Sequence, residues 1–288
     1  MIVLQSAISG ALVGGLFAVM AIGMSLTWGM LRIINLAHFA LILLGGYLTF
    51  QLASTSGIDP LLTLVVTVPV LFVVGALIQL AFDRLGLSEF NSLIVSFGLL
   101  IIVVQLVSNV WSADFQRMDA TVNPYATRSV GLGPLAFPLP TLLAFLFGLL
   151  IVGGTHLVLA RTYPGRALRA FAQDRAIASA YGIDHVRLGT LLAGAAGASA
   201  AVAGMLFSLG NALIPTAPFE WVGIVFAVVI LGGIGDAIGT LAAGLLVGAV
   251  SGVVSVVISP AAAPLVIFSA VILALLLRPN GVFARRRA

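Results

Sequence analysis

Long apolar segments separated by short polar breaks occupy almost the whole 288-residue chain. The segments are long enough to cross the hydrocarbon core of a bilayer as helices. The breaks at 31–36 and 232–240 fit either loops or kinks, so the pattern predicts an all-α polytopic membrane protein with eight or nine transmembrane helices in one domain, residues 1–288. The segments lie near residues 2–30, 36–54, 60–82, 91–110, 140–160, 188–210, 221–235, 237–258 and 262–277.

One polar interruption, residues 161–187, stands apart from this pattern. It contains five arginines and two aspartates and carries a net charge of +3. Pro164 suits the first turn of a helix, no proline or glycine occurs from Arg166 to Tyr181, and Gly182 suits the left-handed residue that ends a helix. We therefore predict one amphipathic helix from Arg166 to Tyr181, about 24 Å long at 1.5 Å per residue and too polar to cross a membrane.

The distribution of charge predicts which ends of the spans face the cytoplasm. Hydrophobic residues make up 61% of the chain and charged residues 8%, and the net charge of +4 lies in the loops, so it does not indicate nucleic acid as a partner. Arginine-rich loops mark the cytoplasmic side. Segment 161–187 and the arginine-rich C-terminus are expected there, and the loops at 111–139 and 211–220 on the opposite side, together with the N-terminus if nine spans exist.

Missing residue types narrow the possible activities. All 13 basic side chains are arginine, and the chain contains no lysine and no cysteine. Schiff-base chemistry, thiol chemistry and the lysine of a phosphate-binding loop are thereby excluded. The cores of several spans carry no ionisable residue, whereas carriers driven by proton or sodium gradients use such groups near the middle of the membrane. An enzyme is not expected. A secondary transporter, or a structural or assembly protein of the membrane, remains the alternative to a permease that is powered by a partner.

Polar residues near the span ends are candidates for a solute path. Arg32, Asn35 and His38 fall between the first two spans and fit either a gate or a polar turn. The span near 91–110 contains small and polar side chains, which line a pore or bond to a neighbouring helix. Asp236 lies in a glycine-rich stretch, residues 231–240, that suggests a broken or re-entrant helix. The tentative path residues are Asn35, His38, Asn91, Ser96, Gln105 and Asp236, and no residues have the spacing of metal ligands.

Two further features concern packing and the outer loop. Gly10 and Gly14 are spaced for close helix contact, as are the glycines at 235, 239, 244, 248 and 252. The loop from Trp111 to Pro140 is rich in turn-forming residues, which favours irregular structure. It is either a landing surface for an external protein or a plain connector.

Segment 161–187 also carries a sequence motif. It resembles the cytoplasmic coupling segment of the permeases of branched-chain amino acid ABC importers, in which a pattern close to R-T-x-x-G-R-A-x-R-A-x-x-x-D-x-x-x-A-x-x-x-G-I recurs. The matching residues are Arg161, Thr162, Gly165, Arg166, Ala167, Arg169, Ala170, Asp174, Ala178, Gly182 and Ile183.

Three other stretches resemble the same family, namely residues 25–48, 226–248 and 275–283. The pattern is closest to the LivH type of subunit rather than to its longer LivM-type partner. Two departures occur: Phe39 replaces the usual small glycine after His38, and Asp236 with Ala237 stands where small or polar residues are more common.

The resemblance implies a subunit of a bacterial inner-membrane importer, and the charge distribution predicts that its C-terminus is cytoplasmic. Its partners would be a second permease of the LivM type in a heterodimer, two ABC ATPase subunits that bind ATP and Mg²⁺, a periplasmic solute-binding protein and membrane lipid. This chain would hold no cofactor and would carry branched-chain amino acids or a related small solute. Apolar side chains of the coupling helix would fill a groove of the ATPase while its arginines pair with an acidic rim. The residues implied in coupling are Arg161, Gly165, Arg166, Arg169, Ala170, Phe171, Asp174, Ala178, Gly182 and Ile183.

Overall fold

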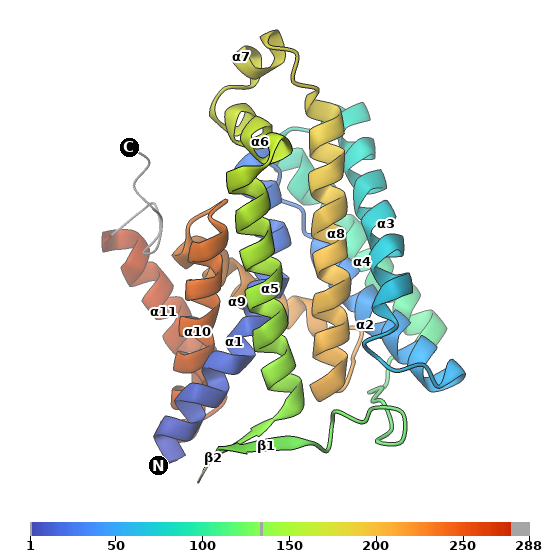
Figure 1. Cartoon of the computed structure of the whole chain (residues 1–288), viewed down its shortest axis with the longest axis vertical. Coiled ribbons are helices and arrows are strands. Elements are labelled where there is room, and N and C mark those ends of the chain that lie inside the picture. The colour runs from blue at the N-terminus through green and yellow to red at the C-terminus, as the bar shows by residue number, and fades with distance from the viewer. Residues whose placement is uncertain (1, 133–134, 278–288) are drawn as a thin grey trace.

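The computed structural model describes residues 2–132 and 135–277, and most of its helices run along one long axis (Figure 1). The arginines of the C-terminus and residues 278–283 of the last matching stretch lie outside the described residues. The helices are α1 (Ile2–Leu26), the π-helical turn η1 (Thr27–Leu31), α2 (Ala37–Ser56), α3 (Leu64–Arg84), α4 (Glu89–Trp111), α5 (Leu139–Arg161), α6 (Tyr163–Gln173), α7 (Arg175–Ala180), α8 (His185–Gly210), α9 (Ala217–Gly232), α10 (Ala237–Val257) and α11 (Ala262–Leu277).

The number of apolar helices agrees with the prediction. Within the described residues, seven helices are long and apolar enough to cross a membrane, with α1 and η1 counted as one span, Ile2–Leu31. The helices α9 and α11 are also apolar but only 16 residues long. The breaks predicted at 31–36 and 232–240 are both true interruptions, because residues 32–36 and 233–236 are not helical.

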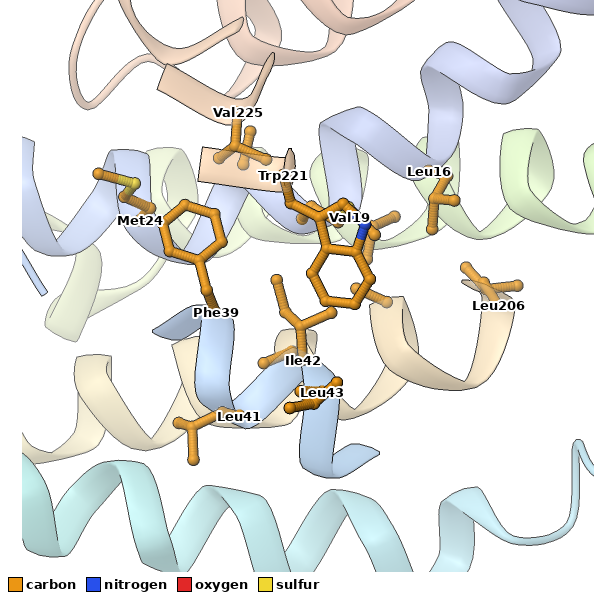
Figure 2. Packing of buried hydrophobic residues seen from close by; sticks show 14 of the residues in the cluster. Leu16, Val19, Met24, Phe39, Leu41, Ile42, Leu43, Leu206, Trp221 and Val225 are labelled. Carbon is orange, nitrogen blue, oxygen red and sulfur yellow. The ribbon is translucent and has the colours of Figure 1, made fainter. Parts of the chain in front are cut away.

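The buried core lies where α1, α2 and α8 meet. These are the most buried spans, and the smaller α9 closes the cluster from the side. Figure 2 shows Phe39 of α2, Met24 of α1 and Trp221 of α9 within this cluster. Phe39 is fully buried. The phenylalanine that departs from the family pattern is therefore a packing residue, and its ring occupies space that a glycine would leave empty.

Glycines bring α1 and α10 into backbone contact, as the spacing of small residues predicted. A methyl group added at Gly14 would overlap the carbonyl oxygen of Gly244, and one added at Gly248 would overlap the carbonyl oxygen of Gly10. Without side chains at these positions the two helices approach closely, which is how membrane helices gain van der Waals contact in the absence of a hydrophobic drive.

The single helix predicted from Arg166 to Tyr181 is wrong. The helix breaks at Asp174, whose backbone is extended with φ −146° and ψ 111°, and α6 and α7 lie on either side. The Asp174 carboxylate accepts a hydrogen bond of 2.9 Å from the Ile177 amide. Aspartate favours this capping geometry over the interior of a helix, so it begins a second helix. The predicted left-handed residue after the helix is confirmed at Gly182, with φ +79°.

The loop between α4 and α5 is more regular than the sequence suggested. Strand β1 (Ser129–Leu132) pairs antiparallel with β2 (Leu135–Pro138), so the chain is not purely helical. The hairpin lies at the end of the bundle opposite α6 and α7 (Figure 1). The Gln5 side chain of α1 donates a hydrogen bond of 3.3 Å to the Ala136 carbonyl, so the start of α1 lies at the hairpin end.

Candidate functional site

The second span begins deep within the bundle. The Nε2 atom of His38 lies 2.9 Å from the carbonyl oxygen of Met20 in α1. From Met20 to the end of η1 at Leu31 the helix advances about 16 Å at 1.5 Å per residue. Residues 32–36 must therefore run back along the first span before α2 starts. The backbone hydrogen bonding of the helix is thus interrupted within the protein interior, where every backbone N–H and C=O group needs a hydrogen-bond partner.

The predicted path residues Asn35, His38 and Ser96 gather around this interruption. The Ser96 hydroxyl accepts a hydrogen bond of 2.9 Å from the Leu36 amide, and the Asn35 side chain accepts one of 3.0 Å from the Ala37 amide. Asn35 is 7% exposed and His38 is 2% exposed. Their bonds run to backbone atoms, so these side chains hold a non-helical segment in place rather than lining an open channel in this conformation.

A different set of polar positions faces outward from α4. Asn91 and Gln105 are exposed, and Gly98 lies midway between them with nothing within 4 Å of an added methyl group. The three positions are seven residues apart and therefore form one stripe along the helix. The Gln105 amide donates 3.2 Å to the Asn109 side chain. Polar groups on a lipid-facing surface are costly, which favours contact of this stripe with protein or water.

Asp236 is the N-cap residue of α10, and among the described residues it forms no hydrogen bond with another path candidate. Its carboxylate accepts a hydrogen bond of 3.1 Å from the Gly239 amide. The preceding loop has positive φ at Gly233 and Gly235, and the Gly235 amide donates 3.1 Å to the Ser25 hydroxyl. The predicted break in the glycine-rich stretch is thus a four-residue loop between α9 and α10. Asp236 caps the N-terminus of α10.

The apolar side of α6 is already occupied by the chain itself. Leu168, Phe171 and Ala178 are buried in a cluster with residues of α1, α5 and α8, and Gly165 packs against the backbone of Leu159. Of the apolar side chains expected to fill a partner's groove, these three therefore fix α6 and α7 to the membrane helices, whereas Tyr181 is exposed.

A second set of residues, on α6 and α7 and in the positions that flank them, is exposed. Tyr181 is 85% exposed, Tyr163 71% and Ile177 59%. Arg161, Arg166, Arg169, Ala170, Asp174 and Gly182 are also exposed, and Ile183 is half-buried. Neither Tyr163 nor Ile177 was expected from the sequence to belong to a docking surface. Ile177 was detectable, because an aspartate at position 174 is a capping signal that resets the helical phase after it.

The loop between α4 and α5 is tied to the body of the protein. The Tyr125 hydroxyl donates hydrogen bonds of 2.9 and 2.7 Å to the two Asp59 oxygens, and the Asn123 amide donates 2.9 Å to the Leu209 carbonyl. Burial, and then the hydrogen bond to Asp59, raise the pKa of Tyr125 to about 12, so the hydroxyl remains a donor at neutral pH. These hydrogen bonds hold the loop against the rest of the protein.

Comparison with known proteins places the chain in a family. Residues 6–277 match the family described as "Branched-chain amino acid transport system / permease component". The chain is 28% identical over 296 residues to the high-affinity branched-chain amino acid transport system permease protein BraD of Pseudomonas aeruginosa, covering 98% of this chain and 96% of BraD.

Two further relatives agree. The permease protein LivH of Escherichia coli is 27% identical over 297 residues, covering 98% of this chain and 96% of LivH. The probable branched-chain amino acid transport permease protein LivH of Methanocaldococcus jannaschii is 27% identical over 250 residues, covering 82% of this chain and 76% of that protein. None of the solved structures matches the chain. With a match that spans nearly all of its residues, the chain belongs to the family of branched-chain amino acid transport system permease components.

Proposed function

We propose that this chain is the membrane permease subunit of an ABC importer for branched-chain amino acids or a closely related small solute. The match of residues 6–277 to the permease family carries this proposal. The relatives' names supply the solute class. A second permease of the LivM type completes the path as a heterodimer, and a periplasmic binding protein delivers the solute.

ATP hydrolysis belongs to partner subunits in this proposal. The chain has no lysine, which a phosphate-binding loop requires, so ATP and Mg²⁺ bind to two ATPase subunits outside it. The exposed surface of α6 and α7 supports docking to such a partner, because it combines two tyrosines and an isoleucine with arginines that can pair with acidic side chains. Burial of the other side of α6 lets the docked partner move the membrane helices as a rigid unit.

The path is assigned to the surface of α4 and the interruption at 32–36. The stripe formed by Asn91, Gly98 and Gln105 faces the second permease and the solute. Asn35, His38 and Ser96 act behind it by holding the interruption, so that a shift of this segment opens or closes the path. Asp236 contributes to the fold of the α9–α10 loop and does not contact the solute.

Orientation is tested by labelling single cysteines, because the chain has none of its own. Tyr181→Cys and Phe115→Cys place thiols on side chains that are 85% and 73% exposed, at opposite ends of the bundle. We expect a membrane-impermeant maleimide to label Phe115→Cys in intact cells and Tyr181→Cys only after the cells are permeabilised. Labelling of Tyr181→Cys in intact cells would reverse the proposed orientation.

Transport and its energy source are tested by uptake. Deletion of this chain is expected to abolish binding-protein-dependent uptake of radiolabelled leucine, and complementation is expected to restore it. Uptake should fail when cellular ATP is depleted by arsenate and should persist when a protonophore collapses the proton gradient while ATP is maintained. Uptake that follows the gradient instead of ATP would favour the secondary transporter.

A further inference from the structure

A cavity of about 430 Å³ lies where the interruption after α1, the turn between α3 and α4, and the start of α8 meet. Its volume falls in the lower part of the range for small-molecule sites, about 300–1,000 Å³. His185 lies in its wall and stacks on Phe171 of α6, with ring centroids 6.0 Å apart and an interplanar angle of 2°. The cavity therefore lies at the α6–α7 end, and Asn91, Gly98 and Gln105 of the α4 stripe do not line it.

The basic side of the cavity is Arg32. Its backbone is left-handed, with φ 56° and ψ 39°, a conformation that a glycine would adopt without strain. Strained backbone positions of this kind cluster at active sites and ligand sites, where the surrounding contacts offset the cost of the strain. Among the residues that the structure describes, Arg187 forms an ion pair with Asp184. The guanidinium of Arg32 is exposed and forms no ion pair with a carboxylate of the described residues. It can bind a carboxylate through two parallel hydrogen bonds.

Asp83 and Glu89 both line the acidic side of the cavity; the Asp83 side chain already accepts a hydrogen bond of 3.1 Å from Gln79, and Glu89 is the first residue of α4. Its Oε1 atom accepts a hydrogen bond of 3.3 Å from the Trp28 indole, which fixes the carboxylate while leaving capacity for further donors. The remaining wall includes the apolar side chains of Phe82 and Leu87. The cavity thus joins one arginine, two carboxylates and an apolar wall in a space suited to a small molecule.

We propose that this cavity binds an α-amino acid with an apolar side chain. The ligand carboxylate pairs with Arg32, its ammonium group with Glu89, and its side chain packs against Phe82 and Leu87. The inference rests on the proposed function, which supplies both the orientation and the solute class. On that basis the cavity opens toward the cytoplasm and binds the imported solute after it accumulates there.

Occupancy is expected to slow transport. The ligand would connect the interruption after α1 with the start of α4, and the adjacent His185–Phe171 stack joins the cavity wall to α6. A ligand that binds one conformation better than another shifts the population toward the first. The cavity is formed in this conformation, so bound amino acid would hold it and oppose the movement that α6 transmits. The site would act as feedback by the product of transport.

Binding is tested on the purified full-length chain in nanodiscs with tritiated leucine. Arg32→Asn, which tolerates the left-handed backbone, and Glu89→Gln are each expected to weaken binding tenfold or more. Arg84→Gln is the matched control, since Arg84 is exposed at the end of α3 and does not line the cavity. Equal thermal melting of the variants establishes that they are folded. Absence of saturable binding, or equal affinity of all three variants, would overturn the proposal.

Ligand analogues assign the two charged contacts. The acid 4-methylpentanoate lacks the ammonium group, so Glu89→Gln should not weaken its binding whereas Arg32→Asn should. The amine 3-methylbutylamine should show the reverse. A second measurement uses vesicles that contain the complete importer: leucine loaded on the cytoplasmic side should slow ATP-driven uptake several-fold in the wild type and less than twofold in Arg32→Asn. If uptake is normal and leucine inhibits the wild type and Arg32→Asn equally, the cavity proposal alone is overturned. If leucine binds normally but no ATP-driven uptake occurs, the proposed function alone is overturned.

Discussion

Gly14→Val is expected to prevent accumulation of folded protein. The first carbon of the new side chain would lie 2.7 Å from the Leu245 Cα atom and would overlap the Gly244 carbonyl oxygen. Both obstacles are backbone atoms of α10, so no side chain can rotate away and the helices would have to separate. Overpacking usually costs about 1–3 kcal/mol, and a clash between two backbones belongs at or above the top of that range. The measurement is the monodisperse fraction on size-exclusion chromatography in detergent, together with the melting temperature.

Gly154→Val provides the matched control for this substitution. Gly154 lies in the middle of α5, and nothing lies within 4 Å of a methyl group added there. The chemical change is identical, and both positions are within a membrane helix. We expect Gly154→Val to behave like the wild type in chromatography and melting. If the two variants lose folded protein to the same extent, close packing of α1 on α10 is not the reason for glycine at position 14.

Apolar length and glycine spacing predicted most of the fold. The seven long spans, the two shorter apolar helices and the α1–α10 contact all follow from residue size and hydropathy, which act locally. The interruption at 31–36 was detectable as a polar stretch, but its depth was not. That depth depends on His38 meeting Met20 and on Ser96 meeting Leu36, and these contacts join helices that are distant in sequence.

The candidate sites were less predictable because periodicity identifies a helix face and not the partner of that face. Phe171 and Leu168 have the spacing expected of a docking surface, yet they pack on the chain's own helices. Three of the path candidates share helix α4 but differ in burial. Asn91 and Gln105 are exposed, whereas Ser96 is buried. The cavity at Arg32 and Glu89 combines residues from separate turns, so no local pattern indicated it.

The second large effect is expected from substitutions on the exposed surface of α6 and α7, which should reduce ATP-driven uptake. Replacing Ile177 and Tyr181 together by alanine is expected to reduce ATP-driven uptake about thirtyfold. Tyrosine and arginine are over-represented among residues whose removal costs 2 kcal/mol or more at an interface, and 2 kcal/mol corresponds to a factor of about 30 in affinity. Both side chains lie outside the core, so the permease itself should remain folded. Arg169→Ala combined with Asp174→Ala should likewise uncouple uptake from ATP hydrolysis without preventing membrane insertion.

Two measurements and one control decide this prediction. Initial uptake rates report coupling, and co-purification of the ATPase subunit with the tagged permease reports docking. Leu85→Ala is the matched control, because Leu85 is 68% exposed in the turn after α3, outside α6 and α7. We expect that variant to retain both uptake and the ATPase subunit. Normal uptake by the Ile177→Ala/Tyr181→Ala variant would contradict docking on this surface, and an equal loss in Leu85→Ala would mean that the surface extends well beyond α6 and α7.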